Sequence, residues 1–264
     1  MNNNKPIGIF DSGLGGLTIL KEMRRVLPKE NIIYFGDSAH VPYGSKSPET
    51  VTEFSMQIAK FLETLDIKFL VVACNTASAF ALPKLQKEIK VPVIGVIEAG
   101  ALQAACKTKK NHIAVIGTQG TINSGSYPAA IKKLNKKHKV FALSAPLLVP
   151  VIEEGWGQSK VASMVAKEYI APVIKSGADT LILGCTHYPI IKPLIKKLAP
   201  KLALVDSAEA VCAQLKDYLT EKDMLKTKGK PLITIFSSDA PKAFGQKAAI
   251  ILESKPPKVM LKKF

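Results

Sequence analysis

The 264-residue chain lacks the features that mark membrane, secreted or zinc-clustered proteins. No apolar run approaches the ~20 residues that a membrane-spanning helix requires. The N-terminus lacks the three features of a signal peptide, which are a basic segment, a long apolar core and a cleavage site. The cysteines form no C-x-x-C pair, which argues against a zinc knuckle or a thioredoxin-like site. We therefore expect a cytoplasmic protein with free thiols, no bound metal and no membrane partner.

Arginine is also scarce. Lys and Arg together number 37, and the only arginines among them are Arg24 and Arg25. The formal net charge of +16 raises nucleic acid as a partner. The lysines, however, lie in short runs such as 107–110, 132–139 and 192–197, and no aromatic residues interleave with them as a base-stacking platform would require. This distribution predicts a lysine-coated surface and no nucleic-acid partner.

The chain does contain enough apolar residues for a full core, with 47% hydrophobic and only 22% charged residues. Short apolar runs alternate with helix-length stretches, which predicts an α/β fold of parallel sheets with helices on both faces. The predicted strands are 7–10, 32–35, 69–73, 93–96, 113–116, 140–143, 180–183, 203–205 and 232–236. The predicted helices include 17–26, 48–65, 77–88, 161–175 and 208–219.

A weak internal repeat indicates two similar lobes. Asp11 opens a Gly-rich turn after a strand, and Cys74 follows another strand 63 residues later. Thr118 and Cys185 repeat this arrangement with a separation of 67 residues. A third landmark lies between them in each half, at residues 38–42 and 144–150. Since ligands of open α/β sheets bind at the carboxyl ends of strands, we expect both cysteines to face one cleft between the lobes.

The repeat also suggests domain limits. The second set of strands is complete before Ser207, so the closing segment is expected to return to the first lobe. The predicted domains are 1–97 plus 207–264, and 98–206.

The first motif, Phe10 to Leu17, is a strand followed by a Gly-rich turn and a helix. The helix N-terminus could receive an anion, although the motif matches neither the dinucleotide-binding pattern nor a P-loop. An ordinary turn in which Asp11 or Ser12 caps the helix is an equal alternative.

Two further motifs carry the cysteines. In the segment 71–78 an apolar strand ends in Cys74, Asn75 and Thr76, and a helix begins. A thiol at a helix N-terminus is expected to have a lowered pKa, and the two polar residues can donate hydrogen bonds to a carboxylate. The segment 183–189 repeats this design, with His187 two residues after Cys185 and no zinc-site spacing.

For any cysteine, the alternative interpretation is an inert, buried, small apolar side chain. We expect that role for Cys106 and Cys212, which lie within helical patterns.

The segments FDSGLGGLT, VPYGSK, VVACNTAS, EEGW and LGCTHYP closely resemble the glutamate racemase family of bacterial cell-wall synthesis. The resemblance covers about Ile7 to Ser207. It implies a two-domain fold with pseudo-twofold symmetry and a cleft between the domains. It also implies interconversion of L- and D-glutamate for peptidoglycan synthesis, with no cofactor and with two cysteines flanking the α-carbon of the substrate.

The resemblance also implies site residues. The catalytic positions are Cys74 (toward D-glutamate), Cys185 (toward L-glutamate), Asp11 and His187. The substrate-contact positions are Asp11, Ser12, Tyr43, Gly44, Asn75, Thr76, Thr186 and His187. Thr118, Thr121 and Glu153 are candidate assisting residues, and for Glu153 a solvated loop acid is as good an interpretation.

The chemistry explains why two thiols are needed. Racemisation removes the α-proton from one face and returns a proton to the other, so one thiolate and one thiol exchange roles between directions. Fixed donors must stabilise the developing carbanion around the substrate carboxylate. Because arginine is scarce, we expect backbone N–H groups and Ser, Thr, Asn and Tyr side chains to bind it.

Several alternatives stay open. An aspartate racemase or another two-cysteine amino-acid racemase would keep both thiols. A basic ligand- or nucleic-acid-binding protein would exploit the net charge, and a decarboxylase would use one cysteine only. A homodimer is open as well.

Overall fold

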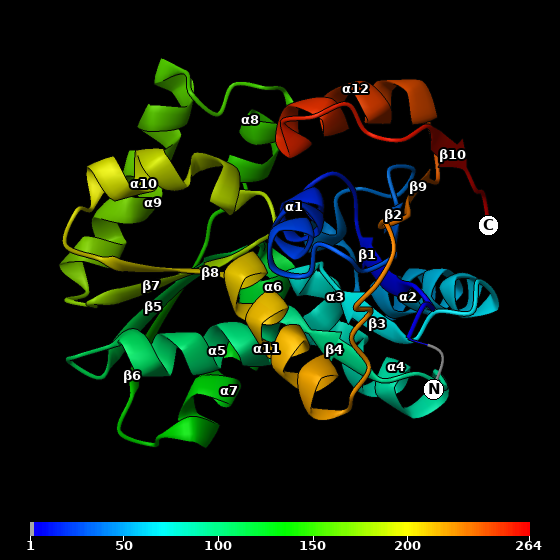
Figure 1. Ribbon diagram of the computed structural model, residues 1–264. Helices are drawn as coiled ribbons and strands as arrows, with labels where there is room; N and C mark the ends of the chain where they lie inside the picture. The colour runs from blue at the N-terminus through cyan, green and yellow to red at the C-terminus, as the bar shows by residue number, and fades with distance from the viewer. Residues whose placement is uncertain (1–2) are drawn as a thin grey trace.

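Two parallel sheets form the framework of the computed structural model, which describes residues 3–264 (Figure 1). The first sheet has the order β10-β9-β2-β1-β3-β4, with strands β1 (Ile7–Asp11), β2 (Ile32–Gly36), β3 (Phe69–Val72), β4 (Val93–Gly95), β9 (Ile233–Ser237) and β10 (Val259–Leu261). The second sheet has the order β6-β5-β7-β8, with strands β5 (His112–Gly117), β6 (Lys139–Ser144), β7 (Thr180–Gly184) and β8 (Ala203–Asp206).

The predicted repeat is visible in the strand order. The order β2-β1-β3-β4 of the first sheet has the same pattern as β6-β5-β7-β8 of the second. Asp11 ends β1 and Thr118 follows β5, while Cys74 and Cys185 follow the corresponding strands β3 and β7. The predicted fold of two similar α/β lobes is therefore confirmed.

The closing segment extends the first sheet. Strand β9 pairs in parallel with β2, and β10 pairs in parallel with β9. Strand β10 was not predicted, since it has only three residues and follows a lysine- and proline-containing stretch that breaks the apolar pattern. The division of the chain at 97/98 and 206/207 stays a prediction.

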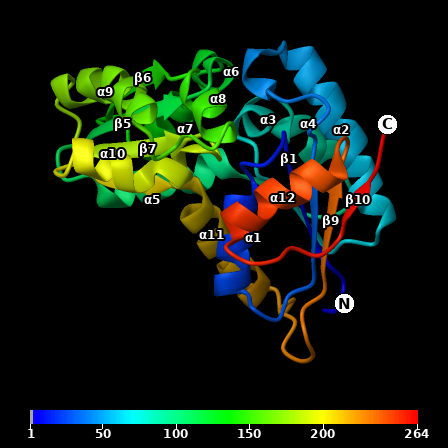
Figure 2. The same ribbon diagram turned by 90° about the horizontal axis from the view of Figure 1, so that it is seen from above.

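Helices cover both faces of each sheet. In the first lobe, α1 packs against α11 and α12, and α2 packs against α3 and α4. Figure 2 shows α1, α11 and α12 grouped on one side of this lobe. The helices and 3-10 helices are α1 (Leu17–Val26), η1 (Tyr43–Ser45), α2 (Pro48–Thr64), α3 (Asn75–Phe80), α4 (Leu82–Glu88), α5 (Val96–Lys107), α6 (Gln119–Asn123), α7 (Ser126–Leu134), α8 (Leu148–Glu153), α9 (Lys160–Lys175), η2 (Tyr188–Ile191), α10 (Lys192–Leu198), α11 (Ser207–Glu221) and α12 (Pro241–Leu252).

The prediction of one helix over 77–88 is wrong, because the structure has two helices that meet at Ala81. Pro83 lies in the first turn of α4 and has no backbone N–H with which to continue the preceding helix. The other predicted helices agree with the structure to within one or two residues at each end.

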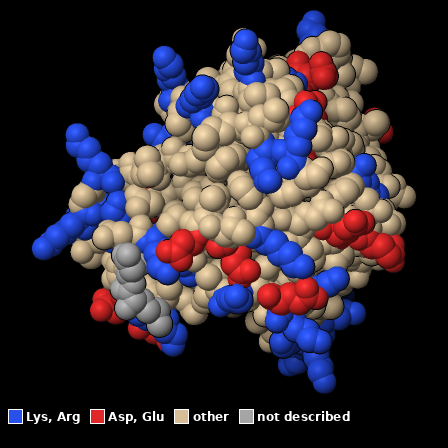
Figure 3. All heavy atoms as spheres, turned by 90° about the vertical axis from the view of Figure 1, so that its right-hand side faces the viewer, with Lys and Arg blue, Asp and Glu red and all other residues tan. Residues whose placement is uncertain are grey.

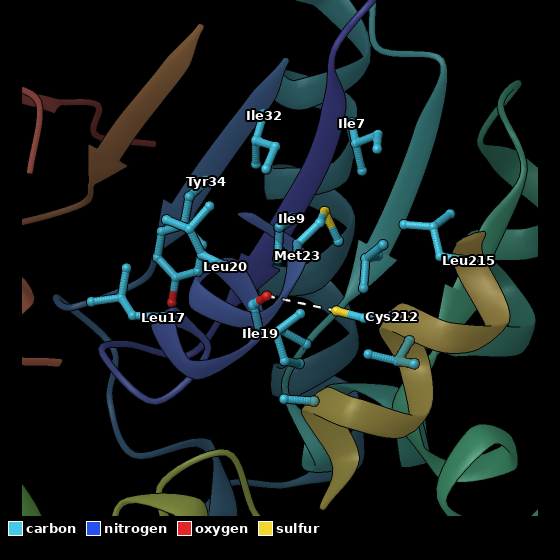
Figure 4. Close-up of a cluster of buried hydrophobic side chains, with 14 of the residues drawn as sticks. Ile7, Ile9, Leu17, Ile19, Leu20, Met23, Ile32, Tyr34, Cys212 and Leu215 are labelled. Carbon is cyan, nitrogen blue, oxygen red and sulfur yellow. Dashed lines mark hydrogen bonds between the residues drawn. The ribbon is translucent and has the colours of Figure 1, made fainter. Parts of the chain in front are cut away.

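Alternating side chains of the strands supply a core on each face of the sheet. Ile7 and Ile9 join one cluster, whereas Phe10 joins the other. Cys212 lies in the first cluster, where its Sγ is 3.7 Å from the Ile19 carbonyl oxygen (Figure 4). The inert role expected for Cys212 fits this burial. The burial expected for Cys106 is wrong, because this residue lies on an exposed face of α5.

Charged side chains are dispersed over the surface that Figure 3 shows. Lys and Arg side chains project over much of this face, in places side by side, and acidic side chains lie among them. Over residues 3–264, no helix combines the length and apolarity that crossing a membrane would require.

Candidate active site

A small cavity contains both strand-end cysteines. Its volume is about 20 Å³, close to the space that one water molecule needs. Cys74 and Cys185 come from different sheets, and each is 5% exposed. The residues that line the cavity are Ser12, Val41, Pro42, Tyr43, Gly44, Cys74, Asn75, Thr76, Thr118, Val149, Cys185, Thr186 and His187.

Most of the predicted site residues therefore meet at one place. The exceptions are Asp11, Thr121 and Glu153, which do not line the cavity but contact residues that do. The apolar walls at Val41, Pro42 and Val149 were recognised in the sequence only as landmarks of the repeat. Because these side chains are apolar, their residue types did not indicate a ligand-binding role.

Asp11 contacts a residue that lines the cavity, and it links the two lobes. Its Oδ2 accepts a hydrogen bond from the Gly13 N–H at 3.1 Å, and its Oδ1 accepts one from the Thr186 hydroxyl at 3.2 Å. Neither Asp11 nor Ser12 caps α1, because Gly16 is the N-cap residue and no side chain caps the helix. Burial raises the pKa of Asp11, while the nearby His187 and the hydrogen bonds oppose that rise.

Cys185, His187 and Glu153 form a chain of contacts. His187 Nδ1 is 3.7 Å from Cys185 Sγ, and its Nε2 is 2.9 Å from Glu153 Oε1. Burial lowers the pKa of His187, but hydrogen bonds to Cys185 and Glu153 outweigh this effect and bring the pKa to about 10. An imidazolium, which is both a positive charge and a proton donor, therefore adjoins the Cys185 sulfur at neutral pH. The solvated-loop interpretation of Glu153 is wrong, because this side chain is a partner of a buried histidine.

Cys74 has different surroundings. It is the N-cap residue of α3, yet its pKa is raised to about 12 by burial and by the carboxylate of Asp11. Hydrogen bonds from Ala77 N–H and from Ser12 oppose the rise without overcoming it. The predicted lowering of the Cys74 pKa is therefore wrong, because loss of hydration and a neighbouring negative charge outweigh the short helix.

Three hydroxyl groups connect the lobes beside Cys74. Thr76 Oγ1 is 2.8 Å from Thr118 Oγ1 and 3.1 Å from Thr121 Oγ1, and the last two are 2.9 Å apart. Gly44 approaches the same place, since a Cβ on Gly44 would lie only 2.5 Å from Thr118 Cβ. The absent side chain allows the Val41–Gly44 loop to close against the second lobe.

Tyr43 lines the cavity, and its hydroxyl group binds a buried carboxylate. Its hydroxyl donates a 2.6 Å hydrogen bond to Asp37 Oδ2. The other oxygen, Asp37 Oδ1, accepts a 2.6 Å hydrogen bond from the Ser238 hydroxyl. It also lies 2.9 Å from His40 Nδ1. Asp37 was not predicted, and it fixes the loop that carries Tyr43 and Gly44.

Asn75 has an unused donor in this site. Its Oδ1 accepts a 2.7 Å hydrogen bond from the Tyr127 hydroxyl, and its Nδ2 has no hydrogen-bond partner among residues 3–264. No group of three or more His, Cys, Asp and Glu side chains within the same residues could hold a metal ion. The site thus combines two thiols, the imidazole of His187, the carboxylates of Asp11 and Glu153, and several uncharged donors.

Comparisons with known proteins agree in sequence and structure. The profile of the family described as Asp/Glu/Hydantoin racemase matches residues 7–215. A glutamate racemase from Geobacter metallireducens is 50% identical over 242 residues, covering 91% of this chain and 90% of that protein. The crystal structure of a glutamate racemase isoform from Bacillus anthracis matches with a TM-score of 0.94 at 38% identity, covering 100% and 98% of the two chains. A glutamate racemase from Francisella tularensis, solved in complex with D-glutamate, matches with a TM-score of 0.93 at 39% identity, covering 99% and 98%.

Proposed function

The chain belongs to the Asp/Glu/Hydantoin racemase family, and on that premise we propose that it is a glutamate racemase. In this proposal it interconverts L- and D-glutamate without a cofactor and supplies D-glutamate for peptidoglycan synthesis. The observation that carries the proposal is that cysteines from corresponding strand ends of two repeated lobes line one cavity.

The proposed reaction transfers protons across the α-carbon. With L-glutamate, the Cys185 thiolate removes the α-proton, and the Cys74 thiol then gives a proton to the opposite face. With D-glutamate, Cys74 is the base and Cys185 is the acid. The raised pKa of Cys74, about 12, supports its role as the thiol in the first direction. His187 and Glu153 support charge development at Cys185.

The α-proton of an amino acid is a weak acid, so the site must stabilise the developing carbanion. Apart from His187, the candidate donors around the cavity are uncharged, and Asn75, Ser12 and Thr186 are among them. Both arginines lie on α1, outside the lining of the cavity.

Single substitutions of the two cysteines test the proposal. We expect Cys74→Ser and Cys185→Ser each to abolish racemisation of both enantiomers while glutamate still binds, as measured by circular dichroism and by calorimetry. Cys106→Ser is the matched control, because this exposed cysteine lies outside the cavity and should keep wild-type turnover. Full racemisation by either site variant would refute the two-base reaction.

The same assays separate glutamate from aspartate. Exchange of the α-hydrogen in deuterated water, measured for each enantiomer without added cofactor, should occur with glutamate. Faster turnover of L-aspartate than of L-glutamate would contradict the proposed substrate, although it would leave the two-thiol chemistry intact.

A further inference from the structure

We propose that Tyr127 is a positioning residue that holds the Asn75 amide with both N–H groups toward the carboxylate of the bound amino acid. The inference rests on the proposed function, because it concerns how the same cavity binds its substrate. Tyr127 lies on α7 in the second lobe, whereas Asn75 begins α3 in the first lobe.

The first support is the state of the Asn75 side chain. It is 2% exposed and lines the cavity, and its Nδ2 is buried without a partner among the described residues. Buried amide groups normally form hydrogen bonds, so an unpartnered donor beside a cavity indicates a ligand that can accept. A carboxylate accepts hydrogen bonds only, which matches the two N–H groups of a primary amide.

The second support is the geometry of the Tyr127 contact. The phenolic hydroxyl donates to Asn75 Oδ1 at 2.7 Å, so the carbonyl oxygen already has a partner and Nδ2 is left as the free group. If the amide were rotated by half a turn, its oxygen would face the carboxylate, and two acceptors would then oppose each other. An asparagine alone does not distinguish these two orientations, because its oxygen and NH₂ group have nearly the same shape.

The third support is that Tyr127 is itself held firmly. Its side chain is fully buried in the cluster that contains Ile97, Ile131 and Val205. A Cβ at Gly100 would come within 3.4 Å of the tyrosine ring and hydroxyl, so Gly100 leaves the space in which the ring lies. The core of the second lobe therefore fixes the position of the hydroxyl, and the hydrogen bond from this hydroxyl holds Asn75 in the first lobe.

Tyr127→Phe tests the inference, because it removes the hydroxyl and keeps the packed ring. Complete loss of a hydrogen bond to a charged group would lower the affinity for glutamate by roughly 10- to 150-fold. An Asn75 amide that rotates freely should lose only part of this affinity. We expect KM and the dissociation constant for both glutamate enantiomers to rise by about three- to thirtyfold. The kcat value should change less, because neither thiol loses a partner.

A double-mutant cycle separates positioning from a structural effect. If Tyr127 acts through Asn75, Tyr127→Phe should have no further effect on KM in an Asn75→Ala background. Tyr188→Phe is the matched control, since its buried hydroxyl also bonds a carbonyl, that of Ala145 at 2.9 Å, but does not contact Asn75. Any effect of that control should be the same in both backgrounds.

The possible failures are distinguishable. If the wild-type enzyme does not racemise glutamate, the proposed function fails. If it does, but Tyr127→Phe leaves KM unchanged or lowers affinity equally with and without Asn75, the positioning role is refuted. Thermal unfolding of each variant identifies loss of folding as the cause of any lost binding.

Discussion

Substitution of Gly15 by alanine should damage the reacting groups while changing the rest of the fold little. A Cβ at this position would lie 2.6 Å from His187 Nδ1 and 2.8 Å from its Cε1, and even closer to Thr186 Oγ1. Ordinary contact begins at about 3.4 Å, so the imidazole would have to withdraw by nearly 1 Å. The same nitrogen is only 3.7 Å from Cys185 Sγ, and a shift of this size would remove that contact.

The expected magnitude follows from these distances. Overpacking a well-packed site typically costs about 1–3 kcal/mol of unfolding free energy. A misplacement of about 1 Å at a reacting group can lower the rate by roughly 100-fold. We therefore expect kcat/KM of Gly15→Ala to fall by about 100-fold in the racemisation assay, with a small decrease in melting temperature.

Gly13→Ala is the matched control in the same turn. Its added Cβ would lie 3.3 Å from a methyl group of Val41 and 3.8 Å from Glu153 Oε1, so small adjustments suffice. This variant should keep activity to within a few fold. Equal activity of Gly15→Ala and the wild-type enzyme would show that the position of His187 does not limit the reaction.

Two further predictions concern charge. Glu153→Gln keeps a hydrogen-bonding oxygen near His187 but removes a negative charge that, together with Cys185, raises the His187 pKa. That pKa should fall by roughly 1–3 units, so the alkaline limb of the kcat/KM profile should move to lower pH, and an unchanged profile would contradict the role of the pair. Replacing both Arg24 and Arg25 by lysine should leave turnover nearly intact, because both side chains are exposed on α1; a large loss in a folded variant would mean that arginine binds the substrate after all.

Local sequence was sufficient to predict the parts of the site that depend on strand ends. Each buried strand ends where its apolar run stops, and parallel strands bring those ends to one edge. Cys74 and Cys185 could therefore be placed at one cleft from the repeat, and both line the same cavity. The repeat of landmarks predicted two similar lobes, and the two sheets share a strand order.

The remaining parts depend on contacts between distant segments. Tyr127 is 52 residues from Asn75, and Ser238 is 201 residues from Asp37, so no local pattern marks either pair. The Cys74 pKa was predicted in the wrong direction, since position at a helix N-terminus is visible in the sequence but burial beside a carboxylate is not.

The two lobes share a fold, but the side chains around their two cysteines differ. Steady-state kinetics can show this difference only in part. The residue two positions after Cys74 is Thr76, within a neutral hydroxyl cluster, whereas the corresponding residue after Cys185 is His187, paired with Glu153. L- and D-glutamate have equal free energy in solution, so kcat/KM must be the same in both directions whatever the surroundings of each thiol. The unequal environments can therefore appear only as compensating differences in kcat and in KM between the enantiomers. A substitution at His187 or Glu153 should change those individual values for the two substrates by different factors while their kcat/KM values fall together.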